Sequence, residues 1–220
     1  MTLEAVLFDM DGTLVDSESM HFVCWSKLLK PYGVSYLEND FCQRFSGRPT
    51  LEAAIEIKQE HNLSVSAQFL ADEKYRLFGE YVITHLPPLM PFTEQTLKAV
   101  KASGLKMALV TGSAKSEAMP ILKGLGFYEL FDTVVTKDDV TNPKPAGDPY
   151  LLALKQINIQ AGNAIAVEDT FTGVTAAAAN NALLRVVAIA NSHTKDHDFS
   201  LATYKMSNLD EFWQWVQSQL

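Results

Sequence analysis

The sequence predicts an α/β fold, with a doubly wound parallel sheet and an all-helical segment inserted into it. Three observations support this prediction. Short apolar runs that end in polar residues recur along the chain, segments of helical periodicity separate most of them, and one long segment has helical periodicity alone. Alternating strands and helices are typical of a Rossmann-like sheet whose crossover connections are right-handed.

Five apolar runs are predicted to form the strands of this sheet. Continuous runs of Val, Ile, Leu and Ala of this length are typical of strands that are buried on both faces of a parallel sheet. In chain order the runs are "AVLF" before Asp9, "MALV" before Thr111, "TVVT" before "KDD", "AIAV" before Glu168 and "RVVAIA" before Asn191.

Helices are predicted between these strands by their end signals. "TEQTLKAVKASG" begins at a threonine and ends at Gly104, "AKSEAMPILKGLG" ends at glycines, and "DPYLLALKQI" has its proline in the first turn. A further helix is expected near "TGVTAAAAN". Each helix falls where a parallel sheet needs a crossover connection.

Residues 17–86 break this alternation. The stretches "SMHFVCWSKLL", "TLEAAIEIKQEH" and "SAQFLADEKYRLFGEYVITHL" place apolar residues at i, i+3 and i+4, and the prolines of "LPPLMP" are expected to end the last helix. We therefore expect a helical domain at residues 17–86, called the helical insertion below. The core domain would comprise residues 1–16 and 87–220, with connections at residues 15–17 and 86–91.

Composition excludes several classes of protein. The chain has 220 residues, 47% of them hydrophobic, and a core of this size needs no metal or disulfide for stability. Cys24 and Cys42 are its two cysteines, without C-x-x-C spacing, and we expect free thiols and a cytoplasmic location. No signal peptide or membrane-spanning run is evident, so no membrane partner is expected.

The net charge narrows the range of partners further. A formal charge of −8 without a basic stripe argues against nucleic-acid binding. An anionic substrate would need local positive charge from a metal ion or a lysine. We expect a monomer that acts on a small molecule.

Two aspartates, Asp9 and Asp11, follow the first predicted strand in "VLFDMDGTLVDSE". Ligands of open α/β sheets bind beyond the carboxyl ends of the strands, and residues i and i+2 of an extended chain point to the same side. Two carboxylates that share a site repel each other, which raises one pKa, and a divalent cation relieves the repulsion. The pair therefore suits a nucleophile beside a proton-bearing acid.

Two other interpretations compete for these aspartates. The dipeptide "DG" is an ordinary turn signal. A calcium loop with Gly12 at its obligatory glycine and Glu18 at its last ligand would need Leu7 as the first ligand, which cannot coordinate calcium. The calcium interpretation therefore fails. The turn interpretation remains possible when "DG" is considered alone.

"DMDGTLVDSE" resembles the first motif, D-x-D-x-T, of the haloacid dehalogenase superfamily, whose members are mostly phosphatases. The family's other motifs follow in order, with Thr111 in "LVTGS", Lys144 in "NPKPAGDPY" and the acids of "AVEDTFTGV". Considered one at a time, each has an ordinary structural explanation: Thr111 as a helix N-cap, Lys144 as a surface lysine, and Glu168 and Asp169 as acids that cap a helix. Their joint placement is explained by the resemblance, and the helical insertion matches the family's C1-type cap.

The resemblance implies a phosphatase mechanism that proceeds through an aspartyl-phosphate. Asp9 would be the nucleophile, and Asp11 would protonate the leaving oxygen and then take a proton from water. Lys144 would stabilise the nucleophile and the phosphoryl group. The phosphoryl oxygens would be bound by the hydroxyl of Thr111 and the backbone N–H groups of Gly112 and Ser113.

The resemblance also implies Mg²⁺ as the cofactor. Its ligands would be Asp9, the backbone carbonyl of Asp11, and Asp169, with Glu168 close to the ion. Asp11 argues against a dehalogenase, because a halide leaving group needs no proton. A phosphonate hydrolase would need a Schiff-base lysine in the cap, and nothing in the sequence marks Lys58 or Lys74 as desolvated.

The cap carries a more specific resemblance. "ESMHFVCW" resembles the start of the cap in β-phosphoglucomutase and related sugar-phosphate phosphatases, so we expect Glu18, His21 and Arg48 to face the substrate, although each is equally an ordinary exposed residue. The lysine-bearing cap motif of the mutase is not evident around "FLADEKYRLF", which favours a phosphatase of sugar or polyol phosphates. A phosphosugar mutase and a catalytically silent phosphate-binding protein are the alternatives.

Overall fold

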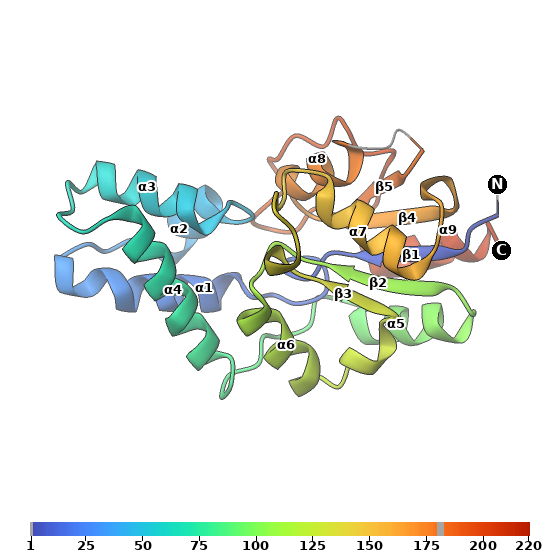
Figure 1. Cartoon of the computed structure of the whole chain (residues 1–220), viewed down its shortest axis with the longest axis horizontal. Helices are drawn as coiled ribbons and strands as arrows, with labels where there is room; N and C mark the ends of the chain where they lie inside the picture. Colours follow the sequence, from blue (N-terminus) through green and yellow to red (C-terminus); the bar gives the residue numbers. More distant parts are fainter. Residues whose placement is uncertain (1, 180–182) are drawn as a thin grey trace.

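The computed structural model describes residues 2–179 and 183–220 of the chain. Its sheet is parallel throughout, and the strand order is β3-β2-β1-β4-β5-β6, so the order reverses at β1 (Figure 1). This arrangement confirms the predicted doubly wound sheet. The strands are β1 (Ala5–Phe8), β2 (Lys106–Val110), β3 (Thr133–Val135), β4 (Ala164–Glu168), β5 (Arg185–Ala188) and β6 (Tyr204–Lys205).

Two layers of helices cover the faces of the sheet, because residues along each strand point alternately to opposite sides. Val6 and Phe8 pack on one side against the apolar faces of α5, α6 and α9, whereas Ala5 and Leu7 pack on the other side against α7 and α8. These helices are α5 (Thr93–Ala102), α6 (Lys115–Gly124), α7 (Asp148–Ile157), α8 (Phe171–Ala179) and α9 (Leu209–Gln217). In the described part of the chain, no helix has the length and apolar character that crossing a bilayer requires.

The register of the strands brings their polar ends to one edge. Phe8 lies opposite Leu109 on β2 and opposite Val167 on β4. Asp9, one residue further along, donates its backbone N–H to the carbonyl of Val167 at 3.0 Å. The residues that follow β1, β2 and β4 therefore meet at the carboxyl edge of the sheet.

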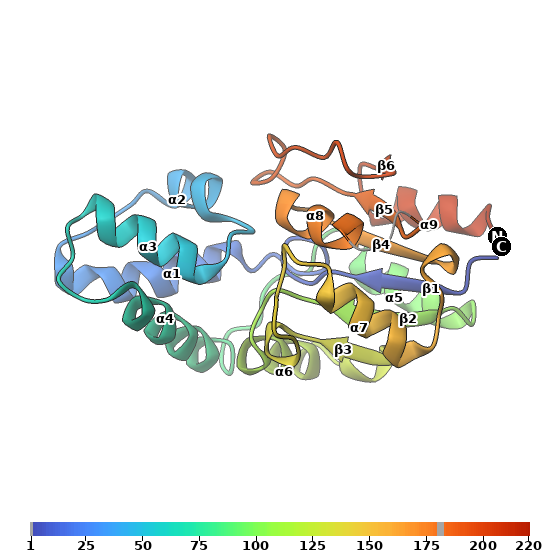
Figure 2. The same cartoon turned by 45° about the horizontal axis from the view of Figure 1, so that its top comes forward.

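The helical insertion lies beyond this edge, beside the sheet rather than on either face (Figures 1 and 2). Its connections run side by side, because Asp16 donates its N–H to the carbonyl of Pro88 at 2.8 Å and Met90 donates to that of Leu14 at 3.0 Å. Both cysteines are buried in the insertion as free thiols, as expected. Its helices are α1 (Glu18–Leu29), α2 (Glu38–Phe45), α3 (Thr50–Glu60) and α4 (Ala67–Tyr81).

Two details of the insertion differ from the expectation. The sequence analysis did not find α2, which is short and has three buried apolar residues, Phe41, Cys42 and Phe45. The last helix was expected to continue to the prolines, but α4 ends at Tyr81. A run of β-branched residues, "VIT", follows at once and disfavours further helix. The domain boundaries at residues 17 and 86 stay a prediction.

Candidate active site

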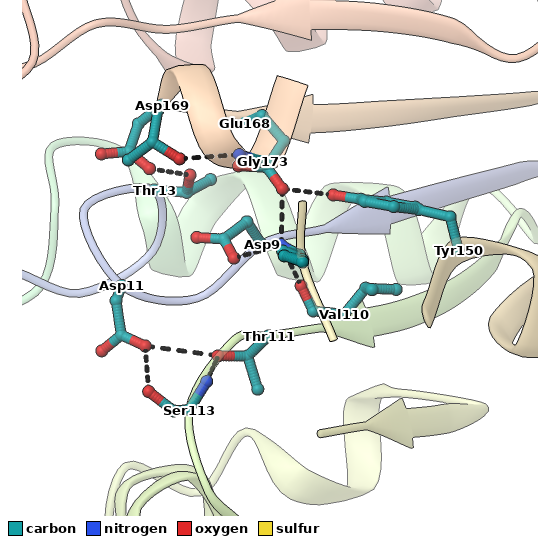
Figure 3. Close-up of polar contacts among 12 residues, drawn as sticks. Asp9, Asp11, Thr13, Val110, Thr111, Ser113, Tyr150, Glu168, Asp169 and Gly173 are labelled. Carbon is teal, nitrogen blue, oxygen red and sulfur yellow. Dashed lines mark hydrogen bonds and ion pairs between the residues drawn. The ribbon is translucent and has the colours of Figure 1, made fainter. Parts of the chain in front are cut away.

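Three carboxylates gather at the carboxyl edge of β1 and β4 (Figure 3). Asp9 follows β1, Glu168 ends β4 and Asp169 comes next, and all three are buried. One carboxylate oxygen from each lies within 4.8 Å of the others. Burial, and then the charge of Glu168, raise the pKa of Asp9 to about 8, while burial and the charge of Asp9 raise the pKa of Asp169 well above its ordinary value.

Lys144 supplies positive charge to this acid cluster. Its Nζ donates to Asp9 Oδ1 at 2.7 Å, to the backbone carbonyl of Val110 at 2.7 Å and to Glu168 Oε1 at 2.5 Å. The hydroxyl of Tyr150 donates to the same oxygen of Glu168. Burial alone would lower the pKa of Lys144, but the charges of Asp9 and Glu168 outweigh it and raise that pKa.

The acid cluster suits a divalent cation. Oε2 of Glu168 is buried and has no hydrogen-bond partner in the described part of the chain. Three carboxylates around a single lysine leave uncompensated negative charge, which is costly in a buried site. Carboxylate oxygens are ligands that Mg²⁺ prefers. The residues present therefore fit the metal that the sequence analysis expected at Asp9, Glu168 and Asp169.

Asp11 is held by a different set of partners. Its Oδ2 accepts hydrogen bonds from the hydroxyls of Ser113 at 2.7 Å and Thr111 at 3.3 Å (Figure 3). Its Oδ1 accepts one from the hydroxyl of Ser17 at 2.5 Å. Thr111 in turn accepts the backbone N–H of Ser113 at 2.9 Å. The side chains of the first and second motifs are therefore directly bonded.

The turn interpretation of "DG" is also correct. Gly12 has a φ of +80° and donates its N–H to the carbonyl of Val15 at 2.7 Å. A Cβ atom at this position would lie 2.1 Å from Asp169 Oδ2, so the turn and the fourth motif are in contact. The turn and the two aspartates belong to one site.

A cavity of about 740 Å³ lies between the carboxyl edge of the sheet and the helical insertion. Gly47 of the insertion packs against Thr170 of the core, because a Cβ at Gly47 would lie 2.3 Å from Thr170 Cγ2. Thr111, Glu168 and Asp169 are buried and are not among the residues that line the cavity. The expected site residues that line it are Asp9, Asp11, Glu18, His21, Arg48, Gly112, Ser113 and Lys144.

Two of the expected cap residues, His21 and Arg48, contact different partners. His21 stacks on Phe78 with ring centroids 4.1 Å apart, and its Nε2 is 3.9 Å from Asp11 Oδ1. Burial, and then the charge of Lys74, lower the pKa of His21 well below its ordinary value, so the ring is neutral at pH 7. Arg48 lines the cavity but forms an ion pair with Glu56 at 2.7 Å within the insertion.

The sequence does not mark Lys58 or Lys74 as desolvated, but the structure buries Lys74. Lys74 is 3% exposed, lines the cavity from α4, and donates to Glu117 Oε1 on α6 at 2.9 Å. Lys58 instead donates to the carbonyl of Leu63, next to the end of α3. The segment "FLADEKYRLF" therefore does place a lysine in the cavity, although it lacks the mutase motif.

Removing Lys74 is expected to destabilise the fold, because Glu117 would be left as a buried charge without its partner. Lys74→Met should lower the free energy of unfolding by about 3 kcal/mol in urea titrations. Lys98→Met removes an exposed ion pair with Glu94 and should cost less than about 1 kcal/mol. Equal losses in the two variants would contradict the buried character of the Lys74 pair.

The raised pKa of Glu18 predicts that the free energy of unfolding depends on pH. Burial, offset in part by Ser46, raises the pKa of Glu18 from 4.5 to about 7, so the folded state holds a proton that the unfolded chain releases between these values. Stability is therefore greatest below pH 4.5 as far as this group is concerned, and falls by about 3 kcal/mol as the pH rises to 7.

Urea unfolding with a metal chelator at pH 5 and pH 7.5 tests this prediction. Asp9 and Asp169 contribute in the same direction, so Glu18→Gln should reduce the fall in stability without abolishing it. Glu38→Gln, on the exposed part of α2, should keep the full fall. If the free energy of unfolding of Glu18→Gln falls between pH 5 and pH 7.5 as much as that of the wild type, the prediction is wrong.

Several residues of the site were missed by the sequence analysis. Tyr150 donates to Glu168, Thr13 donates to Asp169 Oδ1 at 3.3 Å, and Asn191 donates to Asp169 Oδ2 at 2.8 Å. Asn191 directly follows the predicted run "RVVAIA", so the same strand-end rule that selected Asp9 would have found it.

The chain is similar to several known proteins. The chain is 34% identical to the phosphorylated carbohydrates phosphatase of Thermotoga maritima over 80% of each chain, and 32% identical to the fructose-1-phosphate phosphatase YqaB of Escherichia coli over 79% of this chain and 90% of that protein. The structure resembles the β-phosphoglucomutase of Clostridium difficile with a TM-score of 0.80 and 24% identity, covering 99% of this chain and 97% of the other. The sequence model of the haloacid dehalogenase-like hydrolases matches residues 6–189. The chain belongs to the haloacid dehalogenase-like hydrolase family.

Proposed function

We propose that the chain is an Mg²⁺-dependent phosphatase that hydrolyses sugar or polyol phosphates through an aspartyl-phosphate. One observation carries the proposal. Asp9 lines a cavity of about 740 Å³ while Lys144 holds one of its carboxylate oxygens at 2.7 Å and two further buried carboxylates lie beside it. This arrangement supplies a nucleophile, a fixed positive charge and a set of metal ligands at one point.

In the first step a carboxylate oxygen of Asp9 attacks phosphorus, and the bond from phosphorus to the ester oxygen breaks. Asp11 gives a proton to that oxygen, which leaves as an alcohol. In the second step Asp11 takes a proton from water, whose oxygen attacks phosphorus and releases phosphate and free Asp9. The hydroxyls of Thr111 and Ser113 now bond Asp11, and in the proposed mechanism they would bind the phosphoryl oxygens instead.

Asp9, Glu168 and Asp169 would hold the Mg²⁺, together with the backbone carbonyl of Asp11. When bound there, the ion neutralises negative charge on the phosphoryl group and on the acid cluster. Lys144 keeps its three hydrogen bonds to the site and holds Asp9 in place for attack. The backbone N–H of Gly112 completes the proposed phosphate site, and the N–H of Ser113 would join it only by leaving the hydroxyl of Thr111, to which it now donates.

The charges around the cavity favour a neutral leaving group rich in hydroxyls. The two cations that the helical insertion contributes to the lining, Lys74 and Arg48, are already paired with Glu117 and Glu56. Asp11 and Glu18 line the cavity as acids. Lys144 is paired with Asp9 and Glu168, and Lys137 lies over the ring of Tyr75. Lys137 is therefore the one lining cation in the described part of the chain that a second phosphate or a carboxylate could meet without displacing an acid, so we propose sugar and polyol monophosphates over bisphosphates.

We further propose that residues 17–86 form a cap domain that opens and closes over the site. The contact of Gly47 with Thr170 and the pair of Lys74 with Glu117 join the insertion to the core. Small-angle scattering with and without a phosphate analogue such as fluoroberyllate tests this part of the proposal. A radius of gyration that does not change on binding would count against it.

The test of the proposed function is a phosphate-release screen over sugar, polyol and bisphosphate esters with Mg²⁺. We expect release from sugar or polyol monophosphates, weaker release from bisphosphates, and loss of both in a chelator. Inertness across the panel would instead support a silent phosphate-binding protein.

A phosphosugar mutase is the second candidate, and the buried position of Lys74 in the cavity is the observation that favours it. The two activities are separated by following a labelled phosphoryl group. A phosphatase releases the label as free phosphate, whereas a mutase moves it to another carbon of the sugar.

A further inference from the structure

Asn191 connects two parts of the acid site that lie far apart in the sequence. Two residues separate Asn191 from the end of β5. Its Nδ2 donates to Asp169 Oδ2 at 2.8 Å and to the backbone carbonyl of Gly12 at 3.2 Å. One side-chain amide therefore bonds both the carboxylate after β4 and the turn after β1.

The orientation of this amide is fixed by its other contacts. Asn191 Oδ1 accepts the backbone N–H of His193 at 2.8 Å and that of Thr194 at 3.2 Å. Thr194 is fully buried, and its hydroxyl accepts the N–H of Asn191 at 3.0 Å. Exchanging the oxygen and nitrogen of the amide would place donors against donors, so the Nδ2 group must face Asp169.

The space around Asp169 leaves little freedom for its carboxylate. A Cβ at Gly12 would lie 2.1 Å from Asp169 Oδ2 and 2.9 Å from Asn191 Nδ2, so the three groups are in close contact. Thr13 donates to the other oxygen, Oδ1, at 3.3 Å. Asp169 is thus held at one oxygen by Asn191 and at the other by the loop that carries Asp9.

We propose that Asn191 is a positioning residue that orients the carboxylate of Asp169 and ties it to the turn after β1, and that it thereby sets the affinity of the acid cluster for a divalent cation. This inference rests on the proposed metal site. Residues that orient a metal ligand through a hydrogen bond commonly change metal affinity by about 10- to 100-fold when they are replaced. Asn191 acts through Asp169, without itself contacting the phosphoryl group.

The experiment measures Mn²⁺ binding to the full chain by electron paramagnetic resonance, which needs no substrate. Asn191→Ser retains an oxygen acceptor for the turn at residues 191–194 but is too short to donate to Asp169, and Asn191→Ala removes both functions. We expect both variants to bind Mn²⁺ about tenfold more weakly. Thermal unfolding without metal would show whether each variant folds. If Asn191→Ala does not fold, Asn191→Ser alone provides the test.

Asn208→Ala is the matched control. Asn208 also accepts two backbone N–H groups through its Oδ1, those of Asp210 and Glu211, but it caps α9 away from the site. It should lose stability and keep its Mn²⁺ affinity. In turnover assays, Asn191→Ser should need more Mg²⁺ for half-maximal rate and approach the wild-type kcat when Mg²⁺ is saturating.

Each outcome decides the inference. If Asn191→Ser binds Mn²⁺ with wild-type affinity, Asn191 only shapes its own turn and the inference is overturned, while the proposed function stands. If the wild-type chain binds no Mn²⁺, both the inference and the metal part of the proposed function are overturned. If Asn208→Ala weakens binding as much as Asn191→Ser does, the effect is a general loss of stability and the inference fails.

Discussion

Asp9→Asn is expected to lower kcat for phosphate release by about 10⁴-fold or more, because an amide cannot form the mixed anhydride with phosphorus. The substitution also removes one negative charge from the proposed metal site, so the rates are measured at saturating Mg²⁺. An asparagine oxygen can still accept the hydrogen bond that Lys144 donates to Asp9 at 2.7 Å. Burial and the charge of Glu168 raise the pKa of Asp9 to about 8, so a neutral side chain suits this position in the metal-free protein and the variant should fold.

The measurement combines initial rates with trapping of the phosphorylated protein. A denaturing quench during turnover of a ³²P-labelled ester should leave label on the wild-type chain and none on Asp9→Asn. Asp72→Asn, which removes an exposed acid from the rim of the cavity, should stay within a few-fold of the wild-type rate. Normal turnover of Asp9→Asn would take the role of nucleophile away from Asp9.

The sheet was predictable because its interior strands are buried on both faces. Each residue of β1 and β4 is buried, so these strands are continuous apolar runs that stand out in the sequence. β6 has two residues, both exposed, and lies at the edge of the sheet. Because neither residue is buried, the sequence of this strand has no apolar pattern that would predict it. Only its pairing with β5 in the folded structure identifies it as a strand.

The chemical residues after the strands were predictable for a related reason. Parallel strands bring their carboxyl ends to one edge, so polar residues after "AVLF", "MALV" and "AIAV" are expected to meet there. The contacts of Lys74 were not predictable from its own segment. Its partner, Glu117, lies 43 residues away on another helix, and an isolated lysine on an amphipathic helix normally faces water.

Asn191 shows where the strand-end rule needs a second observation. The rule places Asn191 at the correct edge, but the rule does not say which of the many side chains there it will bond. Its contact with Gly12 spans 179 residues and depends on the twist and register of the sheet. The sequence pattern thus predicts that Asn191 lies at this edge, whereas only the folded sheet shows which groups it bonds.

Lys144→Met is expected to lower kcat by about 10³-fold, because the charge next to the nucleophile would be lost. Lys144 is the cation that bonds both Asp9 and Glu168, so its removal leaves two buried carboxylates to repel each other. In the metal-free protein the pKa of Asp9 should then rise further from about 8, so that Asp9 is harder to ionise when Mg²⁺ is limiting.

Initial rates measured from pH 6 to pH 9 at limiting and at saturating Mg²⁺ test this prediction, with Lys137→Met as the control. Lys137 lines the same cavity and lies over the ring of Tyr75, so its loss should change the rate only a few-fold. In Lys144→Met at limiting Mg²⁺ the pH at half-maximal rate should move upward relative to the wild type. A loss of rate without this movement would mean that Lys144 acts on the phosphoryl group alone, and a wild-type rate would mean that Mg²⁺ suffices to keep Asp9 ionised.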